Sequence, residues 1–81
     1  MAVIYKYPLK FGEVNEIRDG FVVHFGADPK GDICAWIMHY DDKDVIMKLY
    51  VVGTGHEFPN SHVAHGSCVD GPFVWHLIEE Y

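Results

Sequence analysis

The groups that could carry chemistry in this sequence gather at a glycine-bracketed turn, Gly53-Thr54-Gly55-His56. Backbone N–H groups between two glycines, a threonine hydroxyl and an imidazole can together bind an anion or the edge of a nucleobase. A structural interpretation stays open beside this one. The glycines would then let the chain leave a long strand, Thr54 would cap the turn through its hydroxyl, and His56 would pack its ring.

Aromatic side chains could complete a binding site at this turn, because every nucleobase has a flat face that stacks on an aromatic ring. Trp75, Tyr50 and Trp36 are the aromatic residues that could serve, and His76 lies next to Trp75 in the last apolar run. We therefore predict no catalytic residue, no metal ligand and no cofactor, and one ligand-binding site. Its predicted members are Gly53, Thr54, Gly55, His56, Trp75 and His76.

Six histidines in 81 residues also raise the question of a metal site, and His62, His65 and Cys68 have the look of a ligand cluster. Odd separations place residues of a strand on opposite faces, so a single site there would need a bulge at Gly66. Zinc sites normally show paired ligands with short knuckle spacing, which this sequence lacks. A metal centre is therefore the less favoured interpretation.

A nucleophilic enzyme would need a serine or cysteine that is activated by histidine and oriented by a carboxylate. The sequence offers Ser67, Cys68, His56 and Glu57, but no strained nucleophile elbow joins them. A water-excluding pocket is hard to build in so small a domain except between subunits. The sequence therefore favours a non-enzymatic protein, with a small hydrolase or metal enzyme left as the alternative.

Length and composition predict a single domain, residues 1–81, because a chain of this size has one small core. Hydrophobic residues make up 49% and aromatic residues 15%, more aromatic surface than one small core easily hides, so we expect a homo-oligomer. The net charge of −6 and the absence of a basic stripe argue against nucleic-acid wrapping. A local nucleotide site remains compatible with that charge.

The sequence shows no signal-peptide pattern and no apolar run of membrane-spanning length, so we expect a cytoplasmic protein without a membrane partner. A reducing compartment disfavours a disulfide between Cys34 and Cys68, and we expect both to be buried apolar side chains.

Alternating apolar residues and turn signals predict six to seven short antiparallel strands and no helix. Residues 2–7 read as an edge strand that Pro8 closes, residues 13–18 as a short strand with a bulge, and residues 33–40 as a central strand. Residues 45–52 read as the longest strand, bent across two sheets. The remaining expected strands are residues 21–25, 62–69 and 73–78. In the first of these His24 shares a face with Val22. The expected turns include a tight turn at residues 28–32 and a polar turn at residues 41–44. The predicted fold class is all-β, a small β-sandwich or partly open barrel.

Three motifs follow one another along almost the whole chain: Tyr5-Lys6-Tyr7-Pro8, then Val51-Val52-Gly53-Thr54-Gly55-His56 with Pro59, then Pro72-Phe73-Val74-Trp75-His76. In this order they resemble a family of short, uncharacterised proteins encoded by tailed bacteriophages. The resemblance implies a phage protein made in the host cytoplasm, and it supplies no activity. The segment from Asp28 to Asp44 resembles the family only in the general character of its residues and not in a motif.

Small phage proteins of this kind include host-takeover binders, defence antagonists and minor structural parts. The chain is similar in size to oligomeric sponges that hold a nucleotide-type immune signal between subunits. We therefore expect a non-enzymatic, oligomeric phage accessory protein that sequesters such a signal or binds a host protein. The alternative is a minor virion or assembly component, to which exposed edge strands would also be suited.

Overall fold

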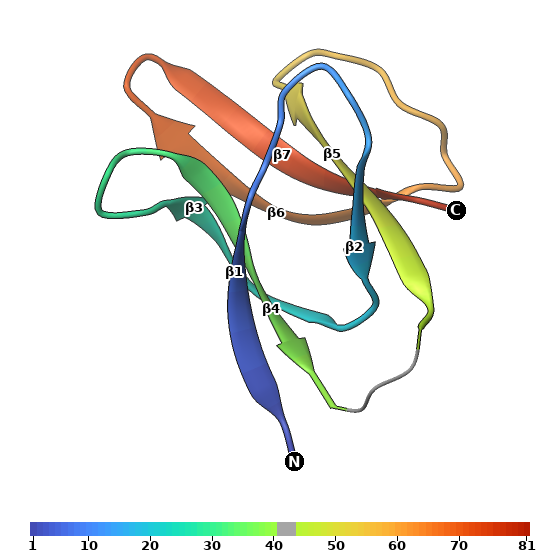
Figure 1. Cartoon of the computed structure of the whole chain (residues 1–81). Coiled ribbons are helices and arrows are strands. Elements are labelled where there is room, and N and C mark those ends of the chain that lie inside the picture. The colour runs from blue at the N-terminus through green and yellow to red at the C-terminus, as the bar shows by residue number, and fades with distance from the viewer. Residues whose placement is uncertain (41–43) are drawn as a thin grey trace.

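A computed structural model describes residues 1–40 and 44–81 and contains seven strands in two sheets (Figure 1). One sheet has three strands in the order β1-β4-β3, and the other has four in the order β2-β5-β7-β6. All of the pairings between neighbouring strands are antiparallel. The strands are β1 (Val3–Pro8), β2 (Asn15–Arg18), β3 (Phe21–Ala27), β4 (Ile33–His39), β5 (Ile46–Gly53), β6 (Val63–Asp70) and β7 (Phe73–Glu80).

The core lies between the two sheets and draws equally on both. Its buried members come from every strand except β1 and β6: Ile17, Phe25, Ile33, Ala35, Ile37, Met47, Leu49 and Leu77. The alternation in β4 and β5 explains this, because every second residue of a strand faces the same side. The predicted all-β sandwich is therefore confirmed, and the two separate sheets favour it over the partly open barrel.

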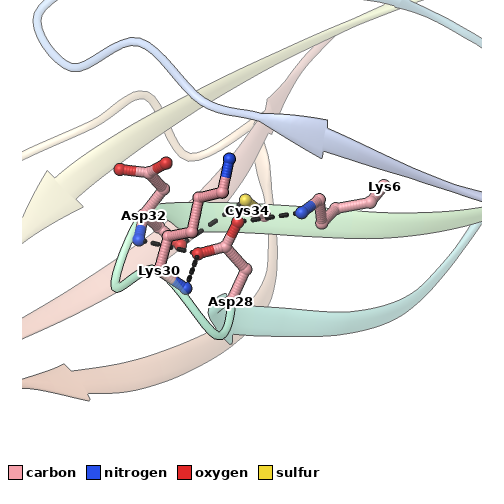
Figure 2. A network of polar contacts seen from close by, with 5 residues as sticks. All are labelled: Lys6, Asp28, Lys30, Asp32 and Cys34. Carbon is pink, nitrogen blue, oxygen red and sulfur yellow. Dashed lines mark hydrogen bonds and ion pairs between the residues drawn. The ribbon is translucent and has the colours of Figure 1, made fainter.

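The turn between β3 and β4 is built around Asp28, as Figure 2 shows. One carboxylate oxygen of Asp28 accepts hydrogen bonds from the backbone N–H groups of Lys30 and Asp32, both at 2.9 Å. The other oxygen accepts from the Lys6 ammonium on β1 at 2.8 Å. This bond from Lys6 is the main reason that the pKa of Asp28 lies below its ordinary value. The predicted tight turn at 28–32 is confirmed, and it also ties β1 to the hairpin.

A histidine lies inside the protein at the end of β4. The side chain of His39 is 1% exposed, and its Nδ1 lies 2.9 Å from the carbonyl oxygen of Asp19. A carbonyl can only accept, so Nδ1 carries the proton. In the neutral ring Nε2 is then the acceptor for the Tyr7 hydroxyl at 2.7 Å. Both nitrogens of this buried ring are thereby satisfied.

Gly20, between β2 and β3, is required for a reason that the turn pattern did not supply. A Cβ atom at this position would lie 2.6 Å from the Met38 carbonyl oxygen and 2.7 Å from Cγ2 of Ile37. The backbone therefore passes too close to β4 for any side chain.

Several details of the predicted strands need correction. β1 is an edge strand and β4 a central one, as predicted, but β2 pairs with β5 in an unbroken register, without the expected bulge. The bulges lie instead in β3, between Val22 and His24, and in β6, between Ala64 and Gly66.

The bulge in β3 reverses the alternation, so Val22 packs against the core while His24 lies on the outer face beside Trp36. The predicted shared face was wrong. β5 is as long as β6 and β7 and belongs to one sheet, so its expected bend across two sheets was also wrong. The polar turn predicted at 41–44 falls largely on residues 41–43, which lie outside the described residues.

Cys34 is fully buried, as expected, whereas Cys68 is only half-buried beside the core. Burial is the main cause that raises the pKa of each thiol. Within residues 1–40 and 44–81 there is no helix long and apolar enough to cross a membrane.

Candidate functional site

The turn after β5 closes through a backbone hydrogen bond from the His56 N–H to the Gly53 carbonyl at 3.2 Å. Gly55 has a φ of +92°, a conformation that only glycine adopts without strain, and this explains the second glycine. The Gly53 N–H donates in return to Nδ1 of His56 at 3.2 Å. Two N–H groups of the turn are thus already hydrogen-bonded, so fewer backbone donors are available for the predicted anion site.

The first glycine, Gly53, does not have a positive φ, and its missing side chain leaves room for two neighbouring rings. A Cβ atom on Gly53 would lie 3.3 Å from the His56 ring and 3.5 Å from the Trp75 ring. Gly53 and Trp75 are direct cross-strand partners on β5 and β7, so the Trp75 ring lies beside Gly53. Since Nδ1 of His56 accepts from the backbone, the neutral ring carries its proton on Nε2.

An aromatic group at this end of the sandwich extends the site beyond the prediction. The rings of Phe73 and Trp75 are stacked, with centroids 5.3 Å apart and an interplanar angle of 20°. Phe11 meets Trp75 edge-on at 4.8 Å, and the indole N–H of Trp75 donates to Asp70 at 3.2 Å. Phe73 is 55% exposed although it is apolar. We call Phe11, Phe73 and Trp75 the aromatic platform.

A hollow of about 500 Å³ lies over part of this platform. The turn and the β6–β7 hairpin line it together, through Gly53, Thr54, His56, Pro72, Phe73, Val74 and Trp75. None of these side chains is a carboxylate, an ammonium or a guanidinium group. The hollow therefore offers an apolar ring surface and an imidazole to a bound molecule.

His76 lies on the opposite face of β7 from Trp75, because neighbouring residues of a strand alternate. Its ring nitrogens contact two hydroxyls, Ser67 at 2.6 Å from Nδ1 and Thr54 at 2.8 Å from Nε2. One hydroxyl donates to the unprotonated nitrogen and the other accepts from the N–H. The structural interpretation expected the Thr54 hydroxyl to cap its own turn. The hydroxyl instead bonds to His76.

The six predicted site residues are neighbours in space, but they form two groups. Gly53, His56 and Trp75 meet at the hollow, whereas His76 is reached only through Thr54. Gly55 shapes the turn and does not line the hollow.

Two aromatic residues of the platform were missing from the prediction. Phe73 shares the face of Trp75 two residues away, so period-two alternation could have added it. Phe11 comes from the segment before β2, and no sequence signal linked it to β7. Of the other stacking candidates, Trp36 lies in the other sheet and Tyr50 bonds to His62 at 2.7 Å.

The residues weighed for zinc have separate partners. His62 bonds to Tyr50, His65 pairs with Glu79 at 2.6 Å, and Cys68 packs beside the core. The bulge that a shared site required is present next to Gly66, yet it turns His65 toward Glu79. Over the described ranges, no three His, Cys, Asp or Glu side chains are grouped closely enough to hold a metal ion.

Comparison with known proteins places the chain in a family. Residues 1–81 match the family described as Domain of unknown function (DUF7352). The chain belongs to this family. No curated protein and no solved structure matches it.

Proposed function

We propose that this DUF7352 protein is a non-enzymatic binding module that holds a small molecule with a flat ring, of the nucleotide type, in the hollow beside the turn. The observation that carries the proposal is the stacked pair of an exposed Phe73 and a half-buried Trp75 beside a hollow of about 500 Å³. Small-ligand sites commonly combine such apolar surface with a few polar groups. His56 supplies such a group here, and Thr54 lines the same hollow while its hydroxyl bonds to His76.

The phage origin implied by the three motifs gives this binding a biological setting. In that setting the protein is an accessory protein of the host cytoplasm that sequesters a nucleotide-type immune signal or binds a host protein. An aromatic ring in the hollow could equally belong to a protein side chain. The first experiment is therefore to determine whether the hollow binds a small molecule or a protein side chain.

Isothermal titration calorimetry with AMP, ADP-ribose and a cyclic dinucleotide tests the proposal. Stacking on one aromatic side chain is worth about 1–3 kcal/mol, so Phe73→Ala should weaken binding about five-fold to a hundred-fold or more. Phe21→Ala is the matched control, because Phe21 is 59% exposed but lies in the other sheet. His56→Ala should also weaken binding, since it removes the free Nε2–H donor.

Native mass spectrometry of freshly purified protein complements the titrations, because it detects a retained small molecule directly. No retained mass and no heat with any of the three probes would refute the nucleotide proposal. Equal losses for Phe73→Ala and Phe21→Ala would show that the hollow is not the site.

A minor virion or assembly component is the second candidate, and the exposed edge of β1 favours it. Mass spectrometry of purified phage particles decides between the two. Stoichiometric amounts of the protein in particles would support the structural role.

A further inference from the structure

One edge of the three-stranded sheet has its backbone groups directed away from the protein. β1 pairs with β4 on one side only, with Val3 opposite His39 and Tyr5 opposite Ile37. The Leu9 N–H donates to the Ile33 carbonyl at 3.0 Å, which continues the same register beyond the strand. Bonding pairs alternate along an antiparallel ladder, so the odd-numbered residues of β1 bond to β4.

The even-numbered residues Ile4 and Lys6 consequently direct their N–H and C=O groups to the open side. Pro8 supports this assignment independently, because proline has no N–H and is tolerated only where none is needed. The open edge thus presents two donors and two acceptors from Ile4 and Lys6, and it ends at Pro8.

The other three edges in the described part of the chain carry features that oppose pairing with another strand. β2 has only four residues, two of them charged, Glu16 and Arg18. β3 and β6 are each interrupted by a bulge, and these two edges also contact each other. Short strands, charges and bulges are the usual protection of sheet edges. β1 has six residues and no bulge, and Lys6 and Pro8 are its only residues of the protective kind.

The side chains of β1 also leave the edge open. Val3, Ile4 and Tyr5 are apolar or aromatic and are 40%, 51% and 51% exposed. The one charge on the strand, Lys6, is bound to Asp28 at 2.8 Å and therefore does not guard the edge (Figure 2). Exposed apolar residues on both faces of an open edge strand are typical of a protein contact.

We propose that β1 pairs antiparallel with β1 of a second copy of the chain, about a two-fold axis at Tyr5. Ile4 of each copy then forms a bonding pair with Lys6 of the other, which gives four backbone hydrogen bonds. The two three-stranded sheets become one continuous six-stranded sheet. The inference rests on the strand edge and not on the hollow, so it stands or falls separately from ligand binding.

Symmetry and charge select this register and this partner. An axis at Lys6 would place two lysines directly opposite each other, which is unfavourable. An axis at Ile4 would leave only one bonding pair between strand residues. The chain carries a net charge of −6, yet its first acidic residue is Glu13, so β1 is a segment through which two acidic copies can approach without opposing carboxylates.

Ile4→Pro tests the backbone bonds, because it removes an N–H on the open side and leaves the bonds to β4 intact. Sedimentation equilibrium of the untagged protein should give a dimer for the unmodified chain and a dimer weakened ten-fold or more for Ile4→Pro. The matched control Ile4→Thr keeps the N–H and a branched side chain, and it should remain dimeric. A monomeric unmodified chain, or a dimer that Ile4→Pro leaves unchanged, would overturn the proposal.

A cross-link tests the register without a proline. The axis brings residue 5 of the two copies opposite each other in a non-bonded pair, with Cα atoms about 4.5 Å apart, within disulfide range. In a Cys68→Ser background, Tyr5→Cys should form a disulfide-linked dimer under mild oxidation, and Val3→Cys should not. Equal cross-linking at both positions, or none at position 5, would refute the register.

Discussion

Replacing Tyr7 by phenylalanine removes one hydroxyl from a buried polar chain, and the structure gives the size of the effect. The Tyr7 hydroxyl donates to Nε2 of His39 at 2.7 Å, and His39 is 1% exposed. Nδ1 of the same ring is committed to the Asp19 carbonyl, so the ring cannot turn to find another partner without losing that bond. Tyr7→Phe therefore leaves a buried acceptor without a donor.

Leaving a buried acceptor unsatisfied costs about 1–3 kcal/mol. In a domain of this size each kcal/mol lowers the melting temperature by roughly 4–8 °C. We therefore expect Tyr7→Phe to lower the melting temperature by at least about 4 °C. Circular dichroism melts and urea denaturation, both at one fixed protein concentration, measure the change.

Tyr40→Phe is the matched control for this experiment. Tyr40 directly follows His39 at the end of β4, but the residue is 61% exposed, so water satisfies its hydroxyl. The control should lie within about 0.5 kcal/mol of the unmodified protein. If both variants were equally stable, water would have to reach Nε2 of His39, and the assignment of Nε2 as a buried partner of the Tyr7 hydroxyl would be refuted.

Three further perturbations test other parts of the fold. Gly20→Ala should lower the unfolding free energy by about 1–3 kcal/mol in urea denaturation, because its Cβ would lie 2.6 Å from a β4 carbonyl oxygen. Gly26→Ala is the control, because the nearest atoms to its Cβ belong to the movable His24 ring. Equal losses of stability in the two variants would contradict the close approach at Gly20. Folding lowers the pKa of Asp28, so the contribution of its carboxylate to stability is complete above the ordinary aspartate pKa of 3.8 and is lost as the pH falls through the lower folded value. The difference in unfolding free energy between the unmodified protein and Asp28→Asn should therefore shrink as the pH falls through that value. A difference that does not depend on pH would refute the ion pair. Ellman's reagent should label Cys68 first and Cys34 only on unfolding, because Cys34 is fully buried. Labelling of both cysteines at the same rate in the native protein would contradict that burial.

Sequence alternation located most strands because one face of each must be apolar to form the core. Met47 and Leu49 on β5 and Ile33, Ala35 and Ile37 on β4 follow that rule and are buried. The rule failed where a bulge inserts one residue. Nothing in the local pattern around Val23 marked the bulge, since it is fixed by the register against β4.

The candidate site was only partly foreseeable. The turn residues and Trp75 were found from turn chemistry and aromatic type, and Gly53 and Trp75 do pair across β5 and β7. The contact of Phe11 with Trp75, and the hold of Ser67 on His76, join segments far apart in sequence. Such contacts depend on strand order, which local patterns do not encode.

The sequence by itself determined the all-β class, the edge position of β1, the Asp28 turn and the location of a glycine-histidine turn, because these follow from side-chain period, proline and glycine chemistry within a few residues. Only the tertiary structure decided that the glycine of the β2–β3 turn is required by close approach to β4. Only it separated His76 from the hollow and paired His65 with Glu79. These features arise from which strands become neighbours, a choice made by packing the whole chain at once.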